Sequence, residues 1–164
     1  MTVPVSGDGA DEIPSREATV SLREVTKENL RDVLRLRVAP GQDRFVASNA
    51  VSIAQAHFEP DHAWFRAIYA DETPVGFLML HDEPAKPAYY LWRFMIDHRF
   101  QGRGFGARAV ALLLEHVRGR PGAIELRLSH VPGEGSPAPF YERLGFAHTG
   151  EEDEGELVMR IALR

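Results

Sequence analysis

The spacing of hydrophobic positions changes along the chain, and each change marks a predicted element. Alternating runs, or runs rich in β-branched and aromatic residues, predict strands over residues 18–25, 63–70, 73–82, 88–97, 123–131, 145–150 and 155–163. Apolar residues three or four positions apart predict helices over residues 27–38, 44–58, 104–118 and 136–144. Proline and glycine separate most of these runs, as at Pro40-Gly41 and Gly119 to Gly122.

The order of these elements predicts the fold. Three consecutive strands joined by short turns, at 63–70, 73–82 and 88–97, indicate an antiparallel meander. The last of them, the helix 104–118 and the strand 123–131 form one central βαβ unit, which pairs two strands in parallel. We expect an α/β (α+β) fold with a mixed, mostly antiparallel, twisted sheet of six to seven strands flanked by about four helices. We assign residues 1–17 to a mobile N-terminal tail and residues 18–164 to a single domain.

Composition narrows the class of protein. The 164 residues are 44% hydrophobic, which is enough for one sizeable core, and the net charge of −5 argues against a nucleic-acid partner. No apolar run approaches the roughly 18 residues of a membrane span, and the first residues lack the features of a signal peptide. We therefore expect a cytoplasmic protein without a membrane partner. The chain has no cysteine, which excludes disulfides, thiolate metal ligands and a cysteine nucleophile.

A glycine-rich turn stands directly before the helix 104–118. It reads QGRGFG from Gln101 to Gly106. Glycine lets backbone N–H groups approach a ligand, and a helix N-terminus attracts a phosphate through those groups and through its dipole. Arg99 and Arg103 add positive charge nearby. The turn alone is compatible with a tight connection, a dinucleotide loop or a loop for the diphosphate of an acyl-CoA.

The dinucleotide interpretation has partial support. Gly102, Gly104 and Ala107 satisfy the pattern G-x-G-x-x-G/A, and Glu125 follows roughly 20 residues later. However, Glu125 falls inside its predicted strand rather than at its carboxyl end. The chain also has one βαβ unit, whereas a dinucleotide-binding fold is built from several. A Walker A loop is excluded because its Gly-Lys-Ser/Thr sequence is missing.

Two motifs together favour the acyl-CoA interpretation. Gln101, Gly104 and Gly106 match the pattern Q/R-x-x-G-x-G/A, and FYERLGF at residues 140–146 matches F/L-Y-x-x-L-G-F. In this order and on these elements, the motifs resemble the GNAT N-acetyltransferase superfamily over roughly residues 18–164. WRFMID and LGFAHTGEEDEGELVM further resemble bacterial spermine/spermidine (diamine) N-acetyltransferases. The resemblance implies acetyl transfer from acetyl-CoA, as co-substrate, to a primary amine.

The resemblance also implies roles for individual residues. The backbone of Phe94, Met95 and Ile96 is expected to pair with the pantetheine arm, as an added strand pairs with a sheet edge. The expected diphosphate-binding residues are Gln101, Gly102, Arg103, Gly104, Phe105 and Gly106. Tyr141 resembles the tyrosine that protonates the departing thiolate, a task suited to a neutral phenol. Without the motif, the sequence favours Tyr141 as a core aromatic residue like Phe140 beside it.

Two positions depart from the family pattern. Glu134 stands where many relatives have an asparagine that contacts CoA, and Trp92 and Arg93 align with acidic residues of polyamine acetyltransferases. The usual carboxylate base is therefore missing, so that deprotonation of the amine runs through water or through another group. His130 is a candidate, and a satisfied surface histidine is its alternative. Because the chain lacks cysteine, direct transfer in a ternary complex is expected.

The acceptor site is less well defined by the sequence. Carboxylates that could hold a polyamine are Asp43, Glu59, Asp61, Asp82, Glu83 and the run Glu151 to Glu156, whose alternative is a solvated turn. Four aromatic residues could form a cage for a cation or pack in the core: Trp64, Tyr89, Tyr90 and Trp92. The stretch His57 to His62 contains metal-ligating residue types, but a proline divides it. We predict no metal site.

The predicted activity is thus acetylation of a small-molecule amine, with a polyamine such as spermine or spermidine as the leading acceptor. Within the enzyme class the alternatives are an antibiotic, an amino acid or a protein N-terminus. A catalytically silent CoA-binding sensor is the alternative outside it, because the strand carboxylate is missing. Exposed strand edges in this fold also allow a homodimer.

Overall fold

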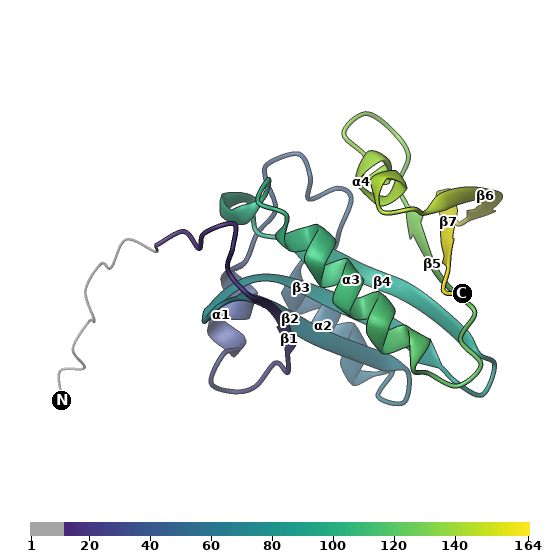
Figure 1. Cartoon of the computed structure of the whole chain (residues 1–164), viewed down its shortest axis with the longest axis horizontal. Coiled ribbons are helices and arrows are strands. Elements are labelled where there is room, and N and C mark those ends of the chain that lie inside the picture. The colour runs from purple at the N-terminus through teal and green to yellow at the C-terminus, as the bar shows by residue number, and fades with distance from the viewer. Residues whose placement is uncertain (1–11) are drawn as a thin grey trace.

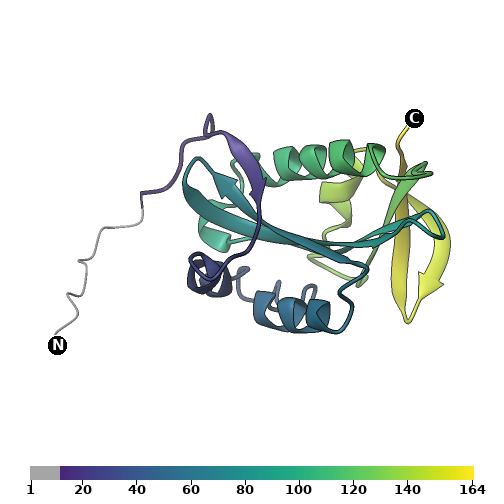
Figure 2. The same cartoon turned by 90° about the horizontal axis from the view of Figure 1, so that it is seen from below.

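The structure is a computed structural model that describes residues 12–164, so most of the predicted tail, residues 1–11, lies outside it. Helices cover both faces of one sheet (Figures 1 and 2). The elements are β1 (Val20–Arg23), α1 (Leu30–Arg35), α2 (Asn49–His57), β2 (Ala63–Ala70), β3 (Thr73–Glu83), β4 (Ala88–Ile96), the 3-10 turn η1 (His98–Phe100), α3 (Phe105–Arg118), β5 (Glu125–His130), α4 (Ala138–Arg143), β6 (Ala147–Asp153) and β7 (Glu156–Ala162).

The sheet has seven strands in the order β1-β2-β3-β4-β5-β7-β6. The pair β4–β5 is parallel and joined through α3, and the other neighbouring pairs are antiparallel. This arrangement confirms the predicted mixed sheet with one central βαβ unit. The last strand in the chain, β7, lies between β5 and β6, so β1 and β6 form the two edges of the sheet.

The core lies on both sides of the central strand β3. Figure 2 shows α3 on one face of the sheet and α1 and α2 on the other. Four consecutive residues of β3 are completely buried, as expected for a strand covered on both faces: Phe77, Leu78, Met79 and Leu80. The helix α3 buries its apolar stripe, including Val110, Leu113 and Val117, against the sheet.

The first two helices are shorter than predicted: contacts with a distant segment end α1, and a local side-chain cap starts α2. α1 ends at Arg35 because the next residues pair with the segment after β4: the N–H of Arg37 donates to Asp97 Oδ2 at 2.9 Å, and its carbonyl accepts from the N–H of His98 at 2.8 Å. α2 begins at Asn49, where the Ser48 hydroxyl accepts from the N–H of Val51 at 3.2 Å. Residues 36–48 thus form a loop.

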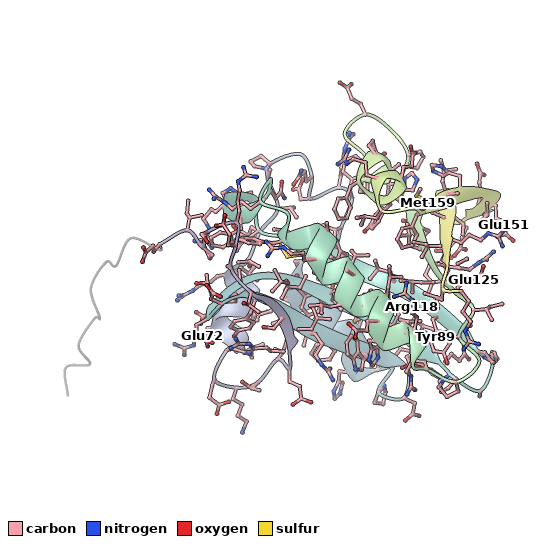
Figure 3. The ribbon with its side chains drawn as sticks, in the orientation of Figure 1. Glu72, Tyr89, Arg118, Glu125, Glu151 and Met159 are labelled. Atoms are coloured by element: carbon pink, nitrogen blue, oxygen red, sulfur yellow. The ribbon has the colours of Figure 1, made fainter. Side chains whose placement is uncertain are left out.

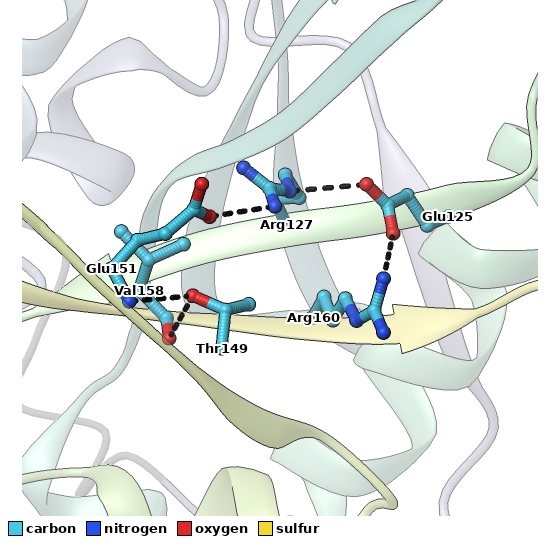
Figure 4. Close-up of polar contacts among 6 residues, drawn as sticks. All are labelled: Glu125, Arg127, Thr149, Glu151, Val158 and Arg160. Atoms are coloured by element: carbon cyan, nitrogen blue, oxygen red, sulfur yellow. Dashed lines mark hydrogen bonds and ion pairs between the residues drawn. The ribbon is translucent and has the colours of Figure 1, made fainter.

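Ion pairs between charged side chains connect segments near both edges of the sheet. Arg23 of β1 forms an ion pair with Glu72 in the β2–β3 turn, at 2.9 Å. At the opposite end, Arg127 of β5 contacts Glu151 of β6 at 2.7 Å and Glu125 at 3.0 Å. Figure 3 shows Glu72 and Glu151 at opposite ends of the molecule, and Figure 4 shows the contacts of Arg127 with Glu151 and Glu125.

Arg108 of α3 links the segment before β1 to the glycine-rich turn. The Arg108 guanidinium donates to the carbonyl oxygens of Arg16 and Ala18, both at 2.7 Å. The same side chain donates to Gly104 O at 3.3 Å and Arg103 O at 3.4 Å. The proposed domain boundary at residue 18 stays a prediction, although contacts to the domain begin at least two residues earlier.

Candidate active site

β4 and β5 are paired only over a short distance. Their register consists of Tyr90 with Arg127 and Leu91 with Leu128. Beyond Leu91 the two strands separate, and the backbone of β4 up to Ile96 has no strand partner on that side. A cleft of about 1300 Å³ opens there, lined by β4, β5, the glycine-rich turn, α4 and the β6–β7 turn.

A bulge in β4 lies at the point of separation. Leu80 of β3 pairs with Leu91, but the preceding Met79 pairs with Arg93, which leaves Trp92 as the extra residue. A bulge of this kind bends the strand and redirects its side chains. Gly76 of β3 allows the close approach, since a Cβ at this position would collide with the carbonyl oxygen of Met95.

The glycine-rich turn presents a row of free N–H groups. Within residues 12–164, the backbone N–H groups of residues 101–107 donate no hydrogen bond to the protein. Gly102 and Gly104 have φ angles of 75° and 79°, and a Cβ on either would meet open space. The 14-residue helix α3 begins at Phe105, so these donors lie at its positive end. The arrangement is chemically suited to a diphosphate.

Most of the predicted cofactor-binding residues come together at this cleft. Eight of the nine line it: Phe94, Met95, Ile96, Gln101, Gly102, Gly104, Phe105 and Gly106. The ninth, Arg103, does not line it, and the Nε of its side chain is buried without a partner among the described residues. Gln42 was missed by the sequence reasoning: its Oε1 accepts from Gln101 Nε2 at 2.9 Å, and no local motif marks this contact.

Asp97 fixes the segment that leads into the turn. It is 1% exposed, and its carboxylate accepts from the backbone N–H of Arg37 and Arg99 and from the Arg99 guanidinium, each at 2.9 Å. Burial alone would raise the pKa of Asp97, but these hydrogen bonds outweigh it and lower the pKa below its ordinary value. Asp97 is therefore a structural carboxylate at neutral pH.

Tyr141 lies in α4 at the wall of the cleft. Its ring contacts Phe94, Phe140 and Phe146, and the residue is 7% exposed. Among the described residues its hydroxyl has no hydrogen-bond partner, and burial raises the pKa of the phenol well above its usual range. The two sequence interpretations thus coexist, because the ring packs in the core while the residue lines the cleft. At neutral pH the hydroxyl is a protonated, unused donor.

His130 also lines the cleft, but it is buried, so the interpretation as a surface histidine was wrong. Its Nε2 lies 2.8 Å from His148 Nε2, and its Nδ1 lies 3.2 Å from the carbonyl oxygen of Val131. If Nδ1 of His130 carries the proton and donates it in a hydrogen bond to the Val131 carbonyl, then Nε2 is unprotonated and accepts a hydrogen bond from His148. Both ring nitrogens are engaged, so His130 has no free lone pair for an acceptor amine.

Two turns bring carboxylates to the cleft. Glu83 lies at the end of β3, where its carboxylate contacts His81 at 3.3 Å and Lys86 at 3.2 Å, and Asp153, Glu154 and Glu156 lie around the β6–β7 turn. The acidic run at 151–156 is thus divided, because Glu151 is paired with Arg127 on the outer surface.

Other predicted acceptor residues lie elsewhere or are engaged. Asp43 lines the cleft, whereas Glu59 and Asp61 do not. Asp82 is buried and paired with Arg120 at 2.9 Å. The predicted aromatic set is dispersed: Tyr90 and Trp92 line the cleft, but Trp64 stacks on His116 with ring centroids 4.1 Å apart, and the Tyr89 hydroxyl donates to Pro121 O.

Within residues 12–164, no three His, Cys, Asp or Glu side chains gather in a way that could hold a metal ion. In the same range, every helix is too short or too polar to cross a membrane.

Comparison with protein families assigns the class. The model of the acetyltransferase (GNAT) family matches residues 27–146, and the chain belongs to this family. It is therefore an acetyltransferase that uses acetyl-CoA, in agreement with the open cleft and the free N–H groups described above.

Two curated relatives are informative. Spermine/spermidine N(1)-acetyltransferase of Bacillus subtilis (strain 168) is 27% identical over 147 residues, covering 86% of this chain and 97% of the relative. L-2,4-diaminobutyric acid acetyltransferase of Streptomyces avermitilis is 28% identical over 95 residues, covering 57% of this chain and 52% of the relative.

Solved structures share the fold. PaiA N-acetyltransferase from Thermoplasma acidophilum, in complex with coenzyme A, has a TM-score of 0.67 at 15% identity, covering 88% of this chain and 99% of that one. An aminoglycoside 6'-N-acetyltransferase complexed with coenzyme A has a TM-score of 0.70 at 15% identity, covering 89% and 97%.

Proposed function

We propose that this acetyltransferase transfers acetyl from acetyl-CoA to a primary amine of a polyamine such as spermine or spermidine. The observation that carries the proposal is the position of Glu83 and of Asp153, Glu154 and Glu156, which come from two separate turns and line one cleft. Carboxylates on separate turns suit a substrate whose positive charges are spaced along a chain. The similarity to the Bacillus subtilis spermine/spermidine enzyme supports the same class of acceptor.

Acetyl-CoA binds along β4 and the glycine-rich turn in this proposal. The pantetheine arm pairs with the backbone of Phe94, Met95 and Ile96, on the side where β4 has no strand partner. The diphosphate takes the N–H groups of Gln101 to Gly106, to which Arg103 contributes its backbone rather than its side chain. A backbone N–H of β4 then polarises the thioester carbonyl.

The reaction is a direct transfer within a ternary complex. The acceptor enters as an ammonium ion and releases one proton to water before it reacts. Its nitrogen then bonds to the acetyl carbon, the C–S bond breaks, and the nitrogen loses a second proton. Tyr141 donates a proton to the departing thiolate and is reprotonated, so that the products are the N-acetylamine, CoA thiol and one free proton. Its protonated hydroxyl, unused by the protein, supports this role.

A panel of amines tests the proposal. CoA thiol release is measured with spermine, spermidine, putrescine, 2,4-diaminobutyrate, an aminoglycoside and a peptide with a free N-terminus. We expect kcat/KM for the polyamines to exceed that for the other amines by at least about tenfold. Polyamine rates near background, with turnover of another amine, would reject the acceptor class. Tight acetyl-CoA binding without turnover of any amine would instead indicate a sensor.

The order of binding is tested in the same assay. Initial rates at several fixed concentrations of acetyl-CoA should give intersecting reciprocal plots, as a ternary complex requires. Parallel plots would indicate an acetylated enzyme intermediate and would contradict direct transfer.

A further inference from the structure

Deprotonation of the acceptor is a step for which β4 supplies no carboxylate at the start of the open cleft. A primary amine resembling the lysine side chain has a pKa of about 10.4, so it arrives at neutral pH as an ammonium ion without a lone pair. β4 carries Trp92 and Arg93 at the start of the open cleft. His130 has both ring nitrogens engaged. A charge at the start of the open cleft offers another way to favour the neutral amine.

Arg93 is the charged residue of β4 at this point. It lies two residues beyond Leu91, the last residue of β4 that pairs with β5, and it lines the cleft. Its guanidinium is held in place: Nη1 donates to Trp92 O and Nη2 donates to Gln55 Oε1, both at 2.9 Å. Its Nε is buried and has no hydrogen-bond partner among residues 12–164.

The side chain of Arg93 is half-buried. Burial lowers the pKa of its guanidinium, and the Glu156 carboxylate raises it. The group nevertheless remains positively charged, because arginine is not deprotonated in proteins. The other titratable residues that line this part of the cleft are His81 and Glu83 of β3, Tyr90 of β4, and Asp153 and Glu154 of the β6–β7 turn.

We propose that the fixed positive charge of Arg93 repels the proton of the acceptor ammonium nearest the thioester and so favours the neutral, nucleophilic amine. The inference rests on the proposed polyamine activity and deepens it. The carboxylates of the two turns hold the distant ammonium group of the acceptor. The released proton goes to water, and no protein base is required.

Like-charge repulsion has a recognisable kinetic signature. A like charge within about 4–6 Å lowers the pKa of an amine, and a shift of one unit changes its neutral fraction tenfold at neutral pH. The same repulsion weakens binding of the ammonium form. Removing it should therefore lower kcat and KM together, which is the pattern expected when ground-state destabilisation is lost.

The variant Arg93→Gln tests this, with spermidine as acceptor and saturating acetyl-CoA. We expect the acidic limb of the kcat–pH profile, recorded from about pH 6.5 to 10, to move upward by about one unit. At pH 7, kcat and the KM for spermidine should each fall by up to about tenfold, while the rates at high pH converge. Arg93→Lys keeps a positive charge and should retain the wild-type profile.

Arg66 provides a matched control, because it resembles Arg93 but lies outside the cleft. Its Nη1 donates to the carbonyl of the preceding residue, Phe65, at 2.7 Å, and its guanidinium lies over the Trp64 ring at 4.2 Å. Burial also lowers its pKa. Arg66→Gln should leave the kcat–pH profile unchanged, and thermal melts establish that each variant is folded.

Different results would contradict the role of Arg93 and the proposed polyamine acetylation. An unchanged acidic limb in Arg93→Gln, or a fall in kcat at every pH with a raised KM, would overturn the role of Arg93 while leaving polyamine acetylation intact. If the wild-type protein turns over no polyamine, the proposed function fails, and the inference that rests on it fails with it.

Discussion

The ring of Tyr141 in α4 meets the ring of Phe94 in β4 at an interplanar angle of 63°, with centroids 6.4 Å apart. Phe94 also stacks on Phe140, the neighbour of Tyr141, at 5.7 Å. The proposed acid is thus supported by the same strand that we propose to carry the pantetheine arm. A shift of β4 would move the phenol of Tyr141 and the pantetheine arm together. The contacts among these rings therefore determine where the phenol lies relative to the thioester.

Replacing Tyr141 with phenylalanine should remove the proton donor and keep the ring. We expect kcat to fall at least about tenfold, because general acid catalysis contributes that much or more. The dissociation constant for acetyl-CoA, measured by titration calorimetry, should stay near the wild-type value since the contacts with Phe94 and Phe146 remain. An unchanged kcat would remove the acid role of Tyr141.

Gly104 should be sensitive to any side chain, although space is available for one. Its φ of 79° is left-handed, so Gly104→Ala introduces strain of roughly 1–2 kcal/mol and reduces the population of the binding-competent turn. We expect the KM for acetyl-CoA to rise about fivefold or more with little change in kcat.

Gly150 is the matched control for this prediction. It has a φ of 87° in β6 and also meets open space, but it does not line the cleft. Gly150→Ala should show similar strain in thermal melts with an unchanged KM. An equal rise in KM in both variants would mean that general destabilisation, rather than the turn, explains the effect.

Asp97 should make stability depend on pH in the acid range. Its folded pKa is lowered, so the carboxylate stabilises the fold above the unfolded pKa of about 3.9, and this contribution is lost as pH falls through the folded pKa. We expect Asp97→Asn to cost about 2 kcal/mol at pH 7, because buried donors lose a charged acceptor. In urea unfolding, the difference in free energy of unfolding between the wild type and Asp97→Asn should be smaller near pH 3 than at pH 7.

Glu72 is the control for Asp97, as an exposed carboxylate in an ion pair with Arg23. Glu72→Gln should have a small effect on stability at either pH, since exposed pairs contribute little. A gap between wild type and Asp97→Asn that stays constant from pH 7 to 3 would contradict the assigned role of the Asp97 charge.

Neutralising the cleft carboxylates should weaken polyamine binding selectively. In Glu83→Gln and Glu156→Gln, we expect the KM for spermidine to rise about three- to tenfold, while that for a monoamine changes little. Glu151→Gln is the control, because Glu151 pairs with Arg127 outside the cleft. Equal effects on mono- and polyamines would argue against charge recognition by these turns.

Helices and strands with a regular spacing of apolar residues and with glycine or turn residues at their ends could be predicted from the sequence. The strand over residues 63–70 is found as predicted, and the helix predicted over 104–118 begins one residue later, at Phe105. Both depend on local features: an aromatic-rich run in β2, and an apolar stripe in α3 that starts after glycines. The glycine-rich turn is likewise predictable, because its glycines indicate a backbone conformation that other residues rarely adopt.

Contacts between distant residues could not be predicted in this way. α1 ends early because Arg37 pairs with Asp97, 60 residues away, and no local pattern reports that partner. The contact of His130 in β5 with His148 in β6 spans β7, which is inserted between these two strands. The same insertion decides which carboxylates of the acidic run reach the cleft and which face outward.

The position of β7 between β5 and β6 has a consequence during protein synthesis. When β5 emerges from the ribosome, its register with β4 offers two residue pairs, and its longer antiparallel partner, residues 156–162, is still to be translated. The nascent chain can therefore assemble β1 to β4 with α3 first, whereas the wall beyond β5 waits for the last strand. That early intermediate already contains the strand and the turn proposed to bind acetyl-CoA, but it lacks Asp153, Glu154 and Glu156, the carboxylates proposed to hold the acceptor.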